Sequence, residues 1–244
     1  MEHYLGYYRT LGKIRERHPD VILENCSSGG LRIDLGILKQ THLTFLSDPD
    51  WPEHGLQLFW GASTMLAPEL LLHWGWSEWL HEHPHQTFDP RDPDLEQHQL
   101  DYYVRISMLT GTGFSQRLPG LPQWVADRYA HHIKIYKDHI RRFIRSADVF
   151  RLTEQPKREG RGDRWAGFQY SLPAGSAHLV FVFRLHGGER ERTLHLRELE
   201  EDRIYTLEWL TDQRSEQRSG SDLMKDGLTF DRLLEEDSAI LLID

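Results

Sequence analysis

Apolar residues in the first 148 positions follow two spacings, one typical of amphipathic helices and one typical of buried strands. Helices are predicted over residues 3–18, 31–39, 53–66 and 122–145. Strands are predicted over residues 21–23, 42–46 and 102–109. Strands that alternate with helices form a parallel sheet, and in such sheets the catalytic and binding residues lie at the ends of the strands. Polar residues at the predicted strand ends are Cys26, Asp48 and those around His73.

The pattern changes after residue 148, where short strands follow one another without helical spacing between them. These predicted strands are residues 168–172, 179–183, 204–209 and 239–243. Glycine-containing turns separate them, which is typical of an antiparallel β-sandwich. The sequence therefore predicts two domains, an α/β domain over residues 1–148 and an all-β sandwich over residues 149–244.

The α/β part is short for the most common fold of its class. A whole (β/α)8 barrel needs about 250 residues, whereas residues 1–148 leave room for only half of its strands. The pattern therefore fits either a small open α/β sheet or a barrel without its first half. Periodicity alone does not decide between these two folds.

Net charge, apolar runs and cysteine content indicate which kinds of partner and which cellular compartment to expect. The formal net charge is -9, so no nucleic acid partner is expected, because there is no basic surface to replace the counterions of phosphate. No apolar run is long enough to span a membrane, and residues 1–4 do not begin a signal peptide. Cys26 is the single cysteine, so no intramolecular disulfide forms. A cytoplasmic protein is predicted.

One motif carries a family resemblance. Cys26 begins a Cys-Ser-Ser-Gly-Gly-x-Arg segment that ends at Arg32, and the Ser47-Asp48 pair follows it. This combination resembles the signature of glycoside hydrolase family 36, the α-galactosidases or melibiases. Further matching segments are residues 59–63, 109–113 and 146–152. The resemblance implies a (β/α)8 barrel followed by a C-terminal β-sandwich, so this chain would hold the second half of the barrel and the sandwich.

The resemblance also assigns roles to residues. Family members hydrolyse terminal α-galactosides with retention, using two carboxyl groups about 5–5.5 Å apart. The acid/base of the pair corresponds to Asp48, and the residues that bind galactose correspond to Cys26, Ser28, Gly29 and Arg32. The acid has to stay protonated near neutral pH, which burial or a neighbouring carboxylate achieves. No cofactor and no metal are implied.

The second carboxylate is not expected in this chain. The family's nucleophile lies in a Lys-x-Asp motif whose place falls before Met1, and no such motif occurs here. The sequence therefore predicts a truncated α-galactosidase-like chain that lacks the nucleophile. Its expected partners are an α-galactoside oligosaccharide and either an upstream half-enzyme chain or further copies of itself. Two other functions stay open: a non-catalytic carbohydrate-binding or interaction remnant, and a fragment of a raffinose-synthase-like transglycosylase.

The signature departs from the family pattern at two positions. Phe45 stands where the family has Trp, and the second Asp of the Ser-Asp-x-x-Asp motif is displaced to Asp50. Both changes indicate a divergent subgroup and bear on the galactose assignment more than on the mechanism.

Structural roles compete with the chemical ones. Asp48, Pro49 and Asp50 could form a turn and a helix N-cap. The alternating histidines at 81, 83 and 85 suit zinc, but Pro84 and the surrounding charges favour a solvated loop. The tryptophans at 74, 76 and 79 are predicted to follow a strand, where they would form a sugar-stacking platform or pack in a core.

Overall fold

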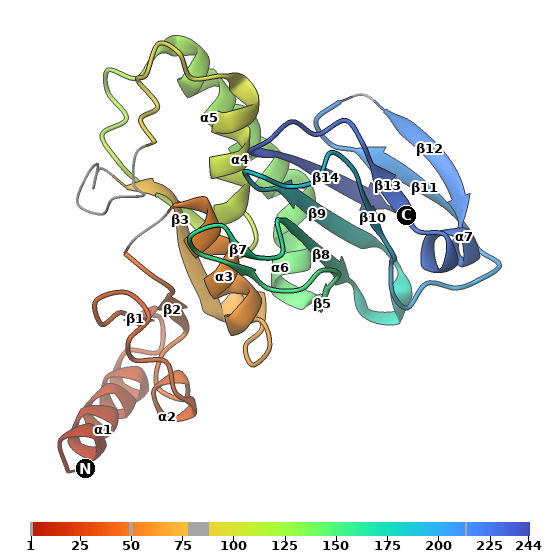
Figure 1. Cartoon of the computed structure of the whole chain (residues 1–244). Coiled ribbons are helices and arrows are strands. Elements are labelled where there is room, and N and C mark those ends of the chain that lie inside the picture. The colour runs from red at the N-terminus through yellow and green to blue at the C-terminus, as the bar shows by residue number, and fades with distance from the viewer. Residues whose placement is uncertain (1, 49–50, 78–87, 213) are drawn as a thin grey trace.

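The computed structural model describes residues 2–48, 51–77, 88–212 and 214–244. It contains a four-stranded parallel sheet in the first part of the chain and a six-stranded antiparallel sheet in the last part (Figure 1). The helix α1 and the first two strands stand out from the rest of the molecule at its N-terminal end (Figure 1). None of the described helices is both long and apolar enough to cross a membrane.

The parallel sheet follows chain order, β1-β2-β3-β4. Its strands are β1 (Glu24–Asn25), β2 (Leu43–Phe45), β3 (Leu71–Ser77) and β4 (Gly111–Ser115). The helices around it are α1 (Glu2–Arg17), α2 (Leu35–Leu38), α3 (Pro52–Ala62), the short 3-10 helix η1 (Pro68–Leu70) and α4 (Gln97–Ser107). The predicted alternation of strands and helices around a parallel sheet is therefore confirmed.

The strand predicted over residues 102–109 is wrong, because this segment belongs to helix α4. A capping box formed by Glu96 and Gln99 starts the helix. The helix then packs between β3 and β14 of the antiparallel sheet, so nearly all of its residues from Leu100 to Ser107 are buried. A helix that is covered on several sides has no polar stripe, and its sequence looks like a buried strand. The strand of this region is β4, which follows directly.

A long helical segment leads from the parallel sheet to the antiparallel one. It consists of α5 (Gln123–Ile135), the π-helical turn η2 (Tyr136–Ile140) and α6 (Arg141–Ser146). The helix predicted over residues 122–145 is therefore confirmed. Within this segment, α6 contacts strand β8 of the antiparallel sheet. Helix α4, which lies outside the segment and was predicted as a strand, packs on β14 of the same sheet.

The antiparallel sheet has the order β12-β11-β14-β9-β8-β5. Its strands are β5 (Asp148–Arg151), β8 (Trp165–Ser171), β9 (His178–Arg184), β11 (Ile204–Trp209), β12 (Ser215–Ser219) and β14 (Asp237–Ile243). Two further pairs are β6 (Pro156–Lys157) with β7 (Arg161–Gly162) and β10 (Arg192–Leu194) with β13 (Leu228–Phe230); the short helices are η3 (Pro173–Gly175) and α7 (Gly220–Lys225). The antiparallel arrangement predicted for this region is confirmed.

Side chains on the two faces of this sheet enter two different cores, because successive residues of a strand point to opposite faces. Phe181 and Phe183 of β9 join a cluster that extends through α4 and α3 to the parallel sheet. Val180 and Val182 join a second cluster with residues of β10 and β13. The first cluster makes the two sheets one continuous packing unit.

Candidate functional site

The predicted acid/base and the predicted sugar-binding loop meet at one edge of the parallel sheet. β1 and β2 are parallel neighbours, with Glu24 opposite Leu43 and Asn25 opposite Thr44. Cys26 follows β1 directly, and Asp48 lies three positions beyond the end of β2. The prediction that Cys26 and Asp48 lie at the carboxyl ends of neighbouring parallel strands is confirmed.

The loop after β1 rests on the backbone that leads to Asp48. Ser28 and Gly29 have φ values of 46° and 74°, and two successive positive φ angles are what a type I′ turn requires. A Cβ atom at Gly29 would lie 2.8 Å from the Cα of Ser47 and 2.9 Å from the amide nitrogen of Asp48. Glycine at this position therefore allows the loop and the Ser47-Asp48 segment to touch.

The buried side chain of Asn25 holds this loop in place, a role that was not predicted from the sequence. The Nδ2 of Asn25 donates to the carbonyl oxygen of Arg32 at 2.5 Å and to the Oγ1 of Thr44 at 2.7 Å. The bond to Arg32 closes the loop on itself, and the bond to Thr44 depends on the pairing of β1 with β2. Asn25 thus ties the two ends of the loop, residues 26–32, to the neighbouring strand.

The predicted binding residues differ in what their side chains contact. Cys26 and Ser28 are exposed, and Gly29 is buried against Asp48. The guanidinium of Arg32 lies over the ring of Tyr7 in α1, 4.9 Å from the ring centroid. The structure thus brings Gly29 to Asp48, places Cys26 and Ser28 on the surface of the loop, and holds Arg32 against α1.

Asp48 does not cap the following helix. The N-cap of α3 is Trp51, which makes no side-chain capping bond, and Pro52 occupies the first helical position. In the described part of the chain, the partly buried Asp48 carboxylate accepts no hydrogen bond and forms no ion pair. The interpretation of Asp48 as the helix cap is therefore wrong, and its carboxylate is available for chemistry.

A second contact that the sequence did not reveal holds the segment before Asp48. The Oγ of Ser47 and the Nε2 of His54 are 2.8 Å apart, and the ring of Trp51 stacks on His54 with centroids 4.4 Å apart. Ser47 is buried. The start of α3 therefore anchors the residue that precedes Asp48.

Asp34, two positions after Arg32, has a structural role. Its Oδ1 accepts from the amides of Gly36 and Ile37 and so caps α2, and its Oδ2 accepts from the Tyr8 hydroxyl at 2.6 Å. The hydrogen bond from Tyr8 is the main reason that the pKa of Asp34 lies below its ordinary value. An ionised capping carboxylate is a poor candidate for a proton donor.

Other residues singled out from the sequence have different outcomes. Trp74 lies within β3 and not after it, and its ring packs on Phe45 with centroids 4.3 Å apart. The histidines at 81, 83 and 85, Trp79 and Asp50 lie outside the described residues, and the side chain of Trp76 is likewise not described. Among the residues described, no group of three or more His, Cys, Asp or Glu side chains is placed to hold a metal.

Comparison with known proteins places the chain beside a group of glycosidases. The family model described as Melibiase matches residues 1–141. An α-galactosidase from Escherichia coli is 29% identical over 147 residues, which are 60% of this chain and 19% of that protein. Alpha-galactosidase C from Emericella nidulans is 21% identical over 245 residues, covering 100% of this chain and 30% of that protein.

A solved structure shares the fold over nearly the whole chain. A variant of the GH36 α-galactosidase AgaA from Geobacillus stearothermophilus, in complex with raffinose, matches with a TM-score of 0.81 and 20% identity. The match covers 98% of this chain and 31% of that one. The chain therefore spans less than a third of the length of these three relatives.

Proposed function

This chain belongs to the melibiase family, glycoside hydrolase family 36, and from this we propose that it is the acid/base-bearing part of a retaining α-galactosidase. The observation that supports this most is the position of Asp48. Asp48 follows β2 at the carboxyl edge of the parallel sheet, its backbone is in contact with the Gly29 loop, and its side chain does not cap α3. Catalytic groups of barrel enzymes lie at that edge.

We propose that the parallel sheet is the second half of a (β/α)8 barrel and that residues 149–244 form the family's C-terminal β-sandwich. The strand order β1-β2-β3-β4 supports the first part, because consecutive parallel neighbours are what half of a barrel contains. The pairing of β10 with β13 supports the second, because residues of these strands share a core with one face of the six-stranded sheet.

In the proposed mechanism Asp48 acts twice. It first protonates the glycosidic oxygen while a second carboxylate attacks the anomeric carbon, and it then removes a proton from the water that releases the sugar. Galactose would lie over the loop after β1, in contact with Cys26, Ser28 and Gly29. The exposure of the first two residues and the contact of Gly29 with Asp48 support this placement. Arg32 would join them by leaving its contact with Tyr7.

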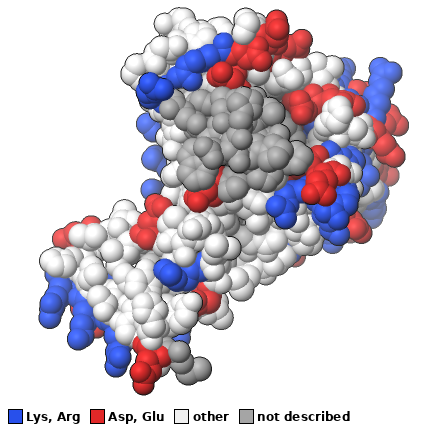
Figure 2. Space-filling model, turned by 60° about the vertical axis from the view of Figure 1, so that its left-hand side comes forward, with Lys and Arg blue, Asp and Glu red and all other residues white. Residues whose placement is uncertain are grey.

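The second carboxylate would come from a segment outside these residues, as the other half of the barrel. In the described residues β1 and β4 are the two edges of the parallel sheet. Among the residues that the structure describes, twelve large apolar side chains are exposed, and six of them lie in the first 35 positions: Tyr4, Leu5, Val21, Ile22, Leu31 and Leu35. In the view of Figure 2 the middle of this protruding part is broadly uncharged, and its charged side chains lie along its outer edge. We propose that this surface packs against the missing barrel half.

A fusion protein tests the assignment of Asp48. The E. coli relative would supply the segment that precedes its aligned region, followed by residues 1–244 of this chain. We expect hydrolysis of aryl α-galactosides, and a loss of about 10²–10⁴-fold in Asp48→Asn for substrates with poor leaving groups. Substrates with a dinitrophenyl leaving group need little protonation, so formation of the glycosyl-enzyme should persist in the variant.

Two results would contradict the proposal. One is full activity of the Asp48→Asn fusion on poor leaving groups. The other is an equal loss in Asp20→Asn, a change at an exposed carboxylate outside the site. Equal losses of Asp48→Asn on poor and activated substrates would assign Asp48 to binding and not to proton transfer.

A further inference from the structure

A cavity whose lining residues are distant in sequence from Asp48 lies between α4, α5 and the antiparallel sheet. Its volume is about 230 Å³, below the roughly 300–1,000 Å³ of pockets for drug-sized ligands and above the roughly 150 Å³ that holds benzene. It is lined by residues of α4, α5, β11, β13 and β14 and of the segments after β11 and β13. A cavity of this size accommodates one small molecule.

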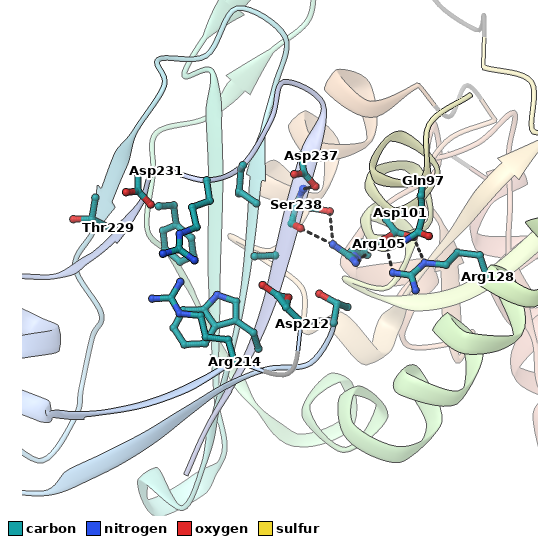
Figure 3. A pocket seen from close by; sticks show the side chains of 16 residues that line it. Gln97, Asp101, Arg105, Arg128, Asp212, Arg214, Thr229, Asp231, Asp237 and Ser238 are labelled. Atoms are coloured by element: carbon teal, nitrogen blue, oxygen red, sulfur yellow. Dashed lines mark hydrogen bonds and ion pairs between the residues drawn. The ribbon is translucent and has the colours of Figure 1, made fainter. Parts of the chain in front are cut away.

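One end of the cavity is built on a buried ion-pair network. Asp101 accepts from Arg105 at 2.9 Å, from the Nε and Nη2 of Arg128 at 2.6 and 2.5 Å, and from His132 at 2.7 Å. Arg105 also donates through Nη1 to the carbonyl oxygen of Ser238 in β14. These bonds hold the wall of the cavity rigid and join α4 to the antiparallel sheet (Figure 3).

Arg105 keeps one donor without an acceptor. Its side chain is 3% exposed, and in the described part of the chain its Nε has no hydrogen-bond partner. A buried unsatisfied donor costs about 1–3 kcal/mol, so a ligand atom that accepts from this nitrogen would be favoured.

Asp237 offers an acceptor at the same end of the cavity (Figure 3). Its two oxygens accept from the amides of Ser238 and Leu234 at 2.7 and 3.2 Å, and it forms no ion pair among the described residues. Burial raises its pKa, and the charge of Arg105 acts in the opposite direction. Arg105 and Asp237 thus influence each other without forming a direct bond.

The other end of the cavity carries Arg214, Asp231 and Thr229 (Figure 3). Arg214 lies over the ring of Trp209 at 4.0 Å and pairs with Glu216 at 2.9 Å. In total four arginine and four aspartate side chains line the cavity. The lining therefore has no net charge, in a chain whose formal net charge is -9.

We propose that this cavity binds a small, neutral, polyhydroxylated molecule of the size of a monosaccharide. A hydroxyl group both donates and accepts, so the hydroxyls of one sugar can donate to a free lone pair of Asp237 and accept from the arginines that line the cavity. An anion would bring a second negative charge to Asp237, and a cation would face Arg105. This site is separate from the proposed active site and does not depend on the assignment of Asp48.

The test is a titration of the full chain with three probes that share one ring and differ in charge: galactose, galacturonate and galactosamine. The signal is the indole N–H resonance of Trp209, which lines the cavity and is assigned by its disappearance in Trp209→Phe. We expect galactose to shift this resonance in a saturable manner, with an affinity at least about tenfold higher than that of either charged probe.

Two variants make the test specific. Asp237→Asn should weaken galactose binding by about tenfold. Because it also removes the negative charge, it should reduce the discrimination against galacturonate, an effect that a general loss of packing does not produce. Asp212→Asn changes an exposed lining residue. It also removes a negative charge, so it should likewise raise the affinity for galacturonate, and the fold should be retained.

The inference would be overturned by the absence of a saturable shift with galactose, by equal affinities for the three probes, or by unchanged binding in both variants. Asp48→Asn distinguishes this site from the proposed active site. It should leave the Trp209 response unchanged. If Asp48→Asn abolishes that response and Asp237→Asn does not, the sugar binds only at the proposed active site, and the cavity is not a ligand site.

Discussion

Gly29 is the residue of the candidate site with the least freedom to change. Its φ of 74° costs an L-residue roughly 1–2 kcal/mol, and a Cβ there would also meet the Ser47 backbone at 2.8 Å. We expect Gly29→Ala to lower the free energy of unfolding by more than the φ cost alone, about 2–4 kcal/mol. In the fusion protein the same change should displace Asp48 and reduce activity. Urea denaturation and hydrolysis assays measure the two effects.

Gly120 provides the matched control for this prediction. Its φ is 84°, and an added Cβ would meet nothing within 4 Å. Gly120→Ala therefore isolates the backbone cost, about 1–2 kcal/mol. If the free energy of unfolding falls equally in both variants, the contact between the Gly29 loop and the Ser47-Asp48 backbone does not contribute to it.

The site was only partly predictable from the sequence, for a reason visible in individual residues. Cys26, Gly29 and Asp48 belong to a motif with fixed spacing, so their place at strand ends followed from the pattern. The bonds of Asn25 with Thr44 and of Ser47 with His54 involve ordinary polar residues. The first exists only because β1 pairs with β2 in one register. No local pattern marks such contacts in advance.

At the scale of elements, α4 determines how the two sheets are joined. Asp101 and Arg105 are four residues apart on this helix and form a buried ion pair, with side chains 5% and 3% exposed. Hydrogen bonds from Arg128 and His132 and the charge of Arg105 hold the pKa of Asp101 well below its usual range, although burial acts to raise it. The carboxylate is therefore ionised at neutral pH.

Removing this carboxylate should be strongly destabilising. Asp101→Asn leaves the buried Arg105 and the half-buried Arg128 without their counter-charge, and breaking a buried pair in this way costs about 3–5 kcal/mol. We expect a fall of that size in the free energy of unfolding, measured by urea denaturation at pH 7.

The chain contains an exposed pair with the same spacing as a control. Lys134 and Asp138 are also four residues apart, with side chains 77% and 45% exposed. Asp138→Asn should cost no more than about 1 kcal/mol, since exposed pairs contribute little. Similar losses in the two variants would mean that the network around Asp101 does not join α4 to β14 as its geometry indicates.

Helix α4 is also the element whose secondary structure was predicted wrongly from the sequence. The amphipathic segments α1, α3 and α5 have one apolar face and were predicted. Helix α4 has buried residues around most of its circumference, because the parallel sheet covers one side and β14 another. Local periodicity reports burial on one face only. A segment that two sheets enclose therefore requires knowledge of both sheets.

At the scale of the whole molecule, buried histidines predict how stability depends on pH. Burial lowers the pKa of His73, His132 and His178 to about 4 in each case. In the unfolded chain they titrate near 6.5, so between pH 6.5 and 4 the unfolded state binds more protons. Stability is therefore expected to fall as the pH is lowered through this window, by up to roughly 3 kcal/mol for each histidine.

Denaturation midpoints at pH 7, 5.5 and 4.5 measure this dependence. His178→Gln removes one contributor and should flatten the slope. His195→Gln changes an exposed histidine and should leave the slope as it is in the parent. A slope that His178→Gln does not alter would show that His178 is not held neutral in the folded state.

The exposed apolar surface of the first 35 residues leads to the last prediction. Leu5 and Ile22 are 53% and 71% exposed in this chain, so Leu5→Lys and Ile22→Lys should change its free energy of unfolding by no more than about 0.5 kcal/mol. In the fusion protein the proposed barrel half would cover these positions. There the same changes would bury a charge without a partner, and we expect a lower melting temperature and reduced hydrolysis of aryl α-galactosides.

Leu234, 55% exposed and near the opposite end of the chain, gives the control Leu234→Lys, which should be harmless in both proteins. If Leu5→Lys and Ile22→Lys are as harmless in the fusion as Leu234→Lys, this surface does not face the rest of the barrel, whatever the role of Asp48.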